Sequence, residues 1–193
     1  QSLREALSEA LKHESGAMQY VLGGVRHAHY QKLPSMDWWM VLAKTGEETL
    51  QVPPHLTLSL DRFVQDLQNR LDRIDGSLSQ LIEKSSSTIE KEGGIRKLLA
   101  SFINENPDVV DASFVDGKGF LRQIEPSEYK NLENADVSKR DHVIAMLKTR
   151  MPVFSSGFPA FEGFLAVDLA RPLYDGRKNF VGSISAFIRP ELL

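Results

Sequence analysis

The segment PVFSSGFPAFEGFLAVDLARPLYDGRKNFVGSISAFI, residues 152–188, decides how this chain folds. Three apolar runs alternate with Gly, Pro and Asp-Gly breaks, which predicts strands at Pro152–Ser155, Gly163–Leu169 and Phe180–Ile188. Asp175-Gly176-Arg177 supplies the turn between the last two strands. The segment contains no His or Cys. The question is whether this sheet carries an active site, a binding pocket or neither.

Two further strands are predicted upstream of this segment. Val109–Val115 and Gly119–Ile124 flank Asp116-Gly117-Lys118, which is a strong hairpin signal. A polar stretch, 125–135, and a short helix around Val143–Leu147 connect the hairpin to the last three strands. The expected fold class is therefore α+β, a five-stranded antiparallel sheet with helices segregated to one side and a long helix before it.

The strongest periodic signal in the sequence comes before the hairpin. Apolar residues step alternately by four and three positions, which is a heptad seam formed by Leu60, Val64, Leu67, Leu71, Ile74, Leu78 and Leu81. We expect a helix from about Leu56 to Lys84, roughly 40 Å long at about 1.5 Å per residue. This helix either packs along its own domain or pairs with a second copy, and both can hold. A second helix is expected at Ile95–Asn104, stopped by Asn106-Pro107.

The first part of the chain is a small helix followed by short strands. Leu3–Leu11 has the apolar spacing of an amphipathic helix, and Ala17–Leu22, Val25–Tyr30 and Trp38–Ala43 are expected to be strands. We therefore divide the chain into residues 1–52, a long-helix part at 53–106, and a sheet core at 107–193.

Composition excludes several classes of function. The chain has 193 residues, a formal charge of −3 and no cysteine, which excludes disulfides and thiolate metal sites and gives no basic patch for nucleic acid. No apolar run reaches the roughly 18 residues that a membrane span needs. Since the sequence begins with Gln1, we interpret it as a fragment of a longer protein, whose membrane attachment would lie in other segments.

In their order and their residues, these elements resemble the Cache family of extracytoplasmic sensor domains, whose core is PAS-like. The likeness covers about Leu56–Leu193 and rests on the long helix and three segments: VVDASFVDGKGFLRQIEP (109–126), DVSKRDHVIAMLKTRMPVFSSGF (136–158) and FLAVDLARPLYDGRKNFVGSISAFI (164–188). Residues 1–52 resemble, more weakly, the back half of a second such module.

The resemblance implies a function without catalysis or a cofactor. Cache domains sense small molecules outside the cell or in the periplasm, and signal through helices and a membrane segment to histidine kinases, cyclases or chemoreceptors. We therefore expect an extracytoplasmic ligand-binding domain of such a receptor. The alternative is a ligand-free structural module that dimerises through the Leu60–Leu81 helix.

The resemblance also places a pocket on the concave face of the sheet. The candidate ligand-binding residues are Arg140, His142, Phe154, Ser155, Ser156, Phe164 and Asp168. Arg140 with the two serines would suit a carboxylate, whereas Asp168 would accept from an amine. Because His142 stands where an aromatic residue often follows in the family, an amino-acid ligand is not favoured. In the alternative interpretation, Asp168 is exposed to solvent and Arg140 forms a surface ion pair.

Two other kinds of site receive less support. His27 and His29 share one face of a strand, but no third ligand has a fixed spacing, so exposed histidines explain them better than a metal does. Ser155 lacks a Gly-x-Ser-x-Gly elbow, and the only nearby histidine is His142, so a hydrolase is not favoured.

Overall fold

The computed structural model describes residues 1–22, 24–32, 39–45, 54–86 and 93–190. The chain forms two compact units, Gln1–Asn69 and Arg70–Leu193. The division falls inside the long helix α2, Pro54–Ser86. The predicted long helix is thus confirmed, with a few more residues at each end.

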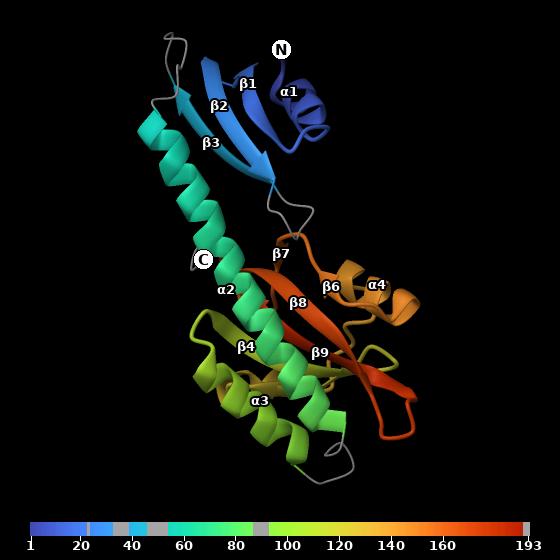
Figure 1. Ribbon diagram of the computed structural model, residues 1–193. Helices are drawn as coiled ribbons and strands as arrows, with labels where there is room; N and C mark the ends of the chain where they lie inside the picture. Colours follow the sequence, from blue (N-terminus) through green and yellow to red (C-terminus); the bar gives the residue numbers. More distant parts are fainter. Residues whose placement is uncertain (23, 33–38, 46–53, 87–92, 191–193) are drawn as a thin grey trace. The chain divides into compact units, whose positions relative to one another are not determined.

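The first unit contains one helix and a three-stranded antiparallel sheet in the order β1-β2-β3 (Figure 1). Its elements are α1 (Leu3–Ala10), β1 (Ser15–Val21), β2 (Val25–Lys32) and β3 (Trp39–Thr45). The helix starts at a capping box, in which Glu5 N–H donates to the Ser2 hydroxyl and Ser2 N–H donates to the Glu5 carboxylate. The predicted helix and three strands are confirmed, while Trp38, the predicted start of the third strand, lies outside the described residues.

The second unit is built on an antiparallel sheet with the order β5-β4-β9-β8-β6. Its strands are β4 (Val109–Asp116), β5 (Leu121–Glu125), β6 (Val153–Phe154), β8 (Leu165–Tyr174) and β9 (Phe180–Ile188). The predicted five-stranded sheet is confirmed. One short strand was not predicted: β7, Phe158–Pro159, pairs with the start of β8.

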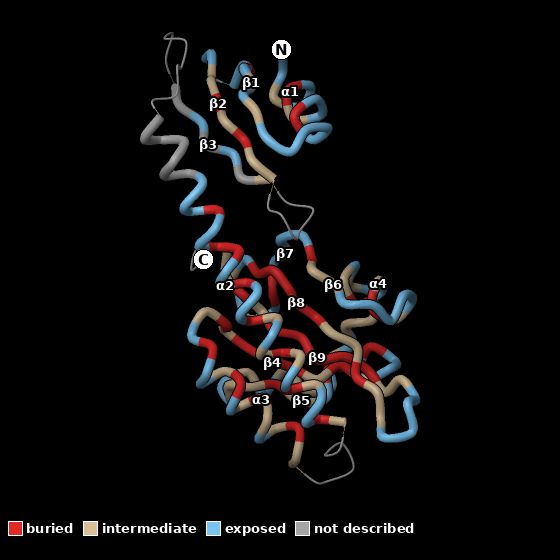
Figure 2. The backbone as a smooth tube through the Cα atoms, in the orientation of Figure 1, coloured by how far each residue is buried: buried red, intermediate tan, exposed pale blue. Residues whose placement is uncertain are grey.

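Helices cover both faces of this sheet, not one as expected. On one face lie α2 and α3 (Gly94–Glu105), and α3 buries Ile95, Leu99 and Phe102 (Figures 1 and 2). On the other face lies α4 (Asp141–Thr149), whose Val143 packs with Val115, Leu121 and Ile124. The short connection η1 (Ser127–Leu132) lies beside it and packs through Tyr129 and Leu132.

The heptad seam of α2 is buried within the chain. The buried members are Val64, Leu67, Leu71, Ile74, Leu78 and Leu81, while the side chain of Leu60 is not among those described. Because these residues are already buried, a dimer formed through this helix would have to use its solvent-exposed side. Packing of the helix along its own chain is therefore the alternative that the seam supports.

The strand register determines what each face of the sheet presents. Ala186 of β9 lies between Ala112 of β4 and Leu169 of β8, and its face carries Arg171, which pairs with Asp75 of α2. Successive side chains of a strand alternate between faces. The opposite face therefore presents a second row, in which Phe187 lies between Asp111 and Asp168.

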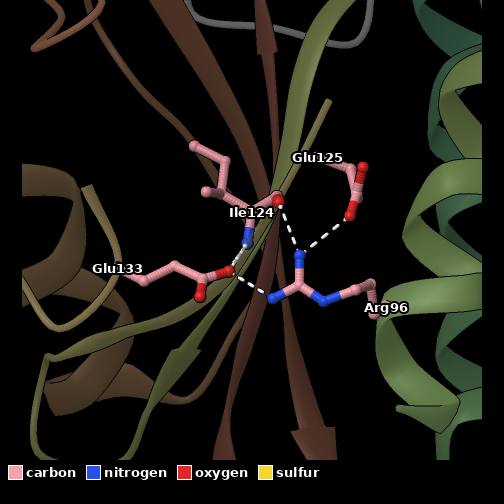
Figure 3. A network of polar contacts seen from close by, with 4 residues as sticks. All are labelled: Arg96, Ile124, Glu125 and Glu133. Atoms are coloured by element: carbon pink, nitrogen blue, oxygen red, sulfur yellow. Dashed lines mark hydrogen bonds and ion pairs between the residues drawn. The ribbon is translucent and has the colours of Figure 1, made fainter. Parts of the chain in front are cut away.

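A half-buried ion network holds the connection between β5 and α4 in place (Figure 3). Arg96 of α3 donates to Glu125 at 2.8 Å, to the Ile124 carbonyl at 3.3 Å, and to Glu133. Glu133 also accepts from Ile124 N–H at 3.3 Å. One guanidinium thus ties α3 to the end of β5 and to the far end of η1.

Candidate functional site

The sheet face turned away from α2 forms the floor of a small hollow. Asp111 and Ser113 of β4, and Ser185 and Phe187 of β9, line this floor. The lining is completed by α4 and by the segment around β7, through Val137, Arg140, His142, Val143, Phe158, Phe161 and Glu162. The volume is about 30 Å³, enough for one water or a group of similar size. We call this hollow the inner chamber.

A larger hollow lies between α4 and β6. Its volume is about 360 Å³, within the range of small-molecule sites. The residues that line it are Lys139, Arg140, Asp141, His142, Ala145, Val153, Phe154, Ser155, Ser156 and Phe158. We call it the outer groove. It brings together five of the seven predicted site residues: Arg140, His142, Phe154, Ser155 and Ser156.

Side chains separate the two hollows, since Arg140, His142 and Phe158 line both of them. The rings of His142 and Phe158 stack with centroids 4.4 Å apart, and Phe158 meets Phe187 edge-on at 5.3 Å. Arg140 donates to the Pro159 carbonyl at 3.0 Å, and its guanidinium lies 4.3 Å from the centroid of the Phe161 ring. Rotation of these side chains would therefore join the chamber to the groove.

Asp168 lies behind this partition and is completely buried. Its Oδ2 accepts from the Ser185 hydroxyl at 3.1 Å, and burial raises its pKa to about 8. The alternative interpretation, in which Asp168 is exposed, is therefore wrong. Arg140 likewise bonds to a carbonyl where that interpretation expected a carboxylate.

His142 and Asp168 are neighbours but not an ion pair at neutral pH. His142 Nε2 lies 3.8 Å from Asp168 Oδ2, which is too long for a hydrogen bond. Burial lowers the pKa of His142 to about 4, so the imidazole is neutral when the carboxyl keeps its proton. Both side chains are therefore uncharged at neutral pH, which suits a neutral ligand or a ligand that carries its own charge.

The two serines have different surroundings. Ser155 Oγ accepts from Asp168 N–H and donates to the Ser156 carbonyl, both at 2.8 Å. It therefore fastens the end of β6 to β8, which leaves no geometry for a nucleophile. Ser156 is exposed in the outer groove.

Phe164, like Asp168, is a predicted site residue that lines neither hollow. Its ring lies beneath the guanidinium of Arg189, at 4.3 Å from the ring centroid. The sequence interpretation counted it among the candidate ligand-binding residues, but β8 begins only at Leu165, so Phe164 precedes the strand.

The sequence interpretation missed two carboxyl groups. Asp111 is fully buried on the chamber floor, where burial, and then the charges of Glu162 and Asp168, raise its pKa well above the usual range. Burial also raises the pKa of Glu162. Alternation along β4 would have found Asp111, because it shares a face with Ser113 inside an otherwise apolar strand.

Comparisons with known proteins agree with this architecture. Residues 69–190 match the family model described as HK/GC/Chemotaxis protein-like, sensor domain. An extracellular ligand-binding receptor from Desulfohalobium retbaense is similar to the chain, with a TM-score of 0.69 and 21% identity over 98% of this chain and 37% of that chain. The comparison with curated proteins finds no match.

Two other solved structures share the fold. The extracellular domain of the putative histidine kinase rpHK1S-Z16 has a TM-score of 0.55 and 16% identity over 64% of this chain and 51% of that chain. The ligand-binding domain of the amino acid chemoreceptor PctC of Pseudomonas aeruginosa, in complex with GABA, has a TM-score of 0.52 and 14% identity over 65% of this chain and 55% of that chain. The chain thus spans between about a third and a little over half of the length of these proteins. Among the described helices, none combines the length and apolarity of a membrane span.

Proposed function

Because the chain belongs to the family of HK/GC/chemotaxis protein-like sensor domains, we propose that its second unit binds a small molecule and reports its presence to an output domain. The family assignment confirms the resemblance to sensor domains that the sequence showed. In this proposal the domain works on the extracytoplasmic side of a membrane. The parent protein is a receptor of the histidine kinase or chemoreceptor type, attached to the membrane through other segments.

The observation that carries the proposal is the outer groove with its polar rim. A hollow of about 360 Å³ is bordered by the cations Lys139 and Arg140 and by the exposed hydroxyl of Ser156. A guanidinium has five N–H donors, and Arg140 uses one of them on Pro159. The groove therefore favours a ligand with a carboxylate, which Arg140 would hold together with Ser156.

The signal would travel through the strand that lies beneath the site. A ligand that displaces the partition of Arg140, His142 and Phe158 would press on β8 near Asp168. Three residues later, Arg171 of the same strand binds Asp75 of α2. The ligand biases this movement only by the difference between its affinities for the two conformations.

A thermal-shift screen of small carboxylates, amines and sugars tests the proposal. A ligand present at 100 times its Kd should add about 2.7 kcal/mol to the free energy of unfolding. Arg140→Ala should abolish the stabilisation by a carboxylate. Lys148→Ala, which removes an exposed cation of the same helix, should not change it. If no compound of any class stabilises the protein, small-molecule sensing by this unit is wrong.

A further inference from the structure

The turn of the β8–β9 hairpin, which projects beyond the neighbouring strands (Figure 1), carries part of an exposed cluster of positive charge. Arg177 and Lys178 lie in this turn, Lys118 lies in the β4–β5 turn, and Arg150 ends α4. All four residues are exposed. They come from three segments that are far apart in the chain, so the sequence alone shows no cluster of this kind. We call this surface the cationic tip.

The ring of Phe180 brings the three segments together. The guanidinium carbon of Arg150 lies 5.2 Å from the centroid of this ring. Gly117, which precedes Lys118, packs against the same ring, because a Cβ at Gly117 would lie 3.7 Å from it. The Gly117 N–H also donates to the Val181 carbonyl at 2.9 Å. Since Phe180 directly follows the β8–β9 turn, the four cations share one side of the second unit.

The acidic side chains beside the cationic tip are already used by their own turns. Asp175 accepts from the backbone N–H groups of Arg177 and Asn179, both at 2.8 Å, and from the Asn179 side-chain amide at 3.0 Å. Asp116 accepts from Lys118 N–H at 2.9 Å and from a guanidinium of its own hairpin. Among the described residues, none forms an ion pair with any of the four cations. The tip therefore presents positive charge on a chain whose formal charge is −3.

Two of the four cations occupy backbone positions that do not favour them. Arg150 has φ of 55° and Lys178 has φ of 64°, in the left-handed region that Gly and Asn adopt at lower cost. The other described non-glycine residue with positive φ is Asn134. Stability alone would therefore favour glycine or asparagine at positions 150 and 178, so the charge at these positions is not explained by folding.

From this we propose that the cationic tip binds an acidic polysaccharide, whose successive carboxylates pair with Lys118, Arg150, Arg177 and Lys178. Long exposed side chains without ion pairs have no fixed geometry, which suits a flexible chain of repeated charges better than one small anion. A protein or a lipid bilayer is a poorer fit, because both also need apolar contacts. In the three segments of the tip, among the described residues, only Met151 is a large exposed apolar side chain.

The inference goes beyond the proposed sensing function. It takes from that function only the extracytoplasmic location, which favours a polysaccharide over a nucleic acid as the polyanion. The tip shares no residue with the outer groove, so the two sites can be tested separately.

Binding of a fluorescein-labelled oligogalacturonate to the whole chain, measured by fluorescence anisotropy, tests the inference. Pairing releases counterions, so the logarithm of the affinity should fall with the logarithm of the salt concentration, with a slope of roughly 0.7 for each cation or about 3 for all four. Neutral dextran should not bind. Absence of oligogalacturonate binding at low salt would overturn the inference. Tighter binding of polyglutamate or of phosphatidylglycerol vesicles would also overturn it, and would assign the tip to an acidic polypeptide or to a membrane.

The double variant Arg150→Asn/Lys178→Asn is decisive, because it removes two charges and places a residue that tolerates the left-handed backbone at both positions. It should weaken oligogalacturonate binding about tenfold at low salt, halve the salt slope, and leave the melting temperature unchanged or higher. Arg177→Gln changes a turn position whose φ is not positive, and should by itself weaken binding about threefold. Unchanged binding in both variants would overturn the inference.

A control of equal charge separates the tip from net charge. Arg73→Gln/Lys97→Gln removes two exposed cations from α2 and α3 and should bind the oligomer like the wild type. Equal weakening by this control would show that net charge alone attracts the polymer, and the tip would be wrong. Oligomer binding that is lost in Arg140→Ala and kept in Arg150→Asn/Lys178→Asn would assign the polymer to the outer groove, which also overturns the inference. If the ligand screen of the proposed function fails while the oligomer binds at the tip, the sensing proposal is wrong and this inference stands.

Discussion

Asp168 and Arg171 lie three residues apart on β8 and face opposite sides of the sheet. Asp168 is buried against Ser185 on the side of α4, whereas Arg171 binds Asp75 of α2 through two hydrogen bonds of 2.7 and 2.5 Å. One strand thus carries both a buried carboxyl group next to His142 of the candidate site and a bidentate ion pair to the long helix. Movement at the site can therefore reach α2 through three residues of one strand and one ion pair.

The first prediction concerns this attachment. In a double-mutant cycle, Asp75→Ala and Arg171→Met should show a coupling energy of about 1 kcal/mol, because the pair is bidentate but partly exposed to solvent. Urea unfolding of the four proteins measures it. Ligand affinity should change less than twofold, while ligand response of the full receptor should fall. A coupling near zero would show that the pair does not hold α2 to β8.

The second prediction is a decrease in stability as the pH rises from 6.5 to 8. Asp168 keeps its proton in the folded protein up to its pKa of about 8, whereas the unfolded chain loses it near 3.8. The folded state therefore binds more protons across this window, and stability falls by up to about 1.4 kcal/mol per pH unit for each such group. The raised pKa of Asp111 acts in the same direction. Below pH 6.5 His142 has the opposite effect. As the pH falls, the unfolded chain takes up a proton on this residue and the folded protein does not, because burial lowers the pKa of His142 to about 4. The free energy of unfolding therefore decreases as the pH falls in this range.

Urea unfolding at pH 6.5 and 8 checks this pH dependence. Asp168→Asn should reduce the slope, because the group whose pKa is about 8 is gone. The variant keeps Ser185, which donates to Asp168, and keeps Arg140 and Glu162, which line the chamber. The change in slope can then be assigned to Asp168. A wild-type stability that rises between the two pH values would contradict the buried, protonated state of Asp168.

The third prediction separates the two serines. Ser155→Ala removes the hydroxyl that accepts from Asp168 N–H, and should lower the free energy of unfolding by about 1–2 kcal/mol. Ser156→Ala should leave stability within about 0.5 kcal/mol, because this residue is exposed. Carboxylate binding, measured by calorimetry, should weaken in Ser156→Ala and change less than twofold in Ser155→Ala. Carboxylate binding that weakens in Ser155→Ala and not in Ser156→Ala would show that Ser155 contacts the ligand.

The fourth prediction compares two glycines. Gly182 of β9 has φ of +151°, and a Cβ there would lie 2.1 Å from the Val115 carbonyl oxygen, so Gly182→Ala should cost several kcal/mol or prevent folding. Gly76 is exposed in α2, and a Cβ there would meet nothing within 4 Å. Gly76→Ala should therefore stabilise the protein by about 0.5–1 kcal/mol. Thermal unfolding of both variants measures the contrast, and a destabilised Gly76→Ala protein would contradict the exposed position of that residue.

Local pattern was enough to predict most elements of the fold. The Asp-Gly turns located both hairpins, and the heptad spacing located α2, because these signals depend on neighbouring residues only. β7 was missed because two residues that include Pro159 carry no periodic signal. The placement of α4 on the opposite face from α2 also depends on contacts between distant segments.

The candidate site was less accessible from the sequence. Five predicted residues border the outer groove because the resemblance placed their loop and strand correctly. The role of Ser155 depends on the β6–β8 register, which no local pattern encodes. The row of Asp111, Phe187 and Asp168 depends on pairing across three strands. Such pairing brings together residues that are far apart in the chain.

The Arg96 network determines which part of the second unit can rearrange. Since one guanidinium fastens both ends of the η1 connection to α3 (Figure 3), that connection and its helix should travel as one rigid block. The hinge must then lie downstream of it, between Asp136 and β8. A fluorescent probe attached at Met151, which is exposed beyond the end of α4, would report ligand-driven motion, whereas one at Lys130 would stay silent.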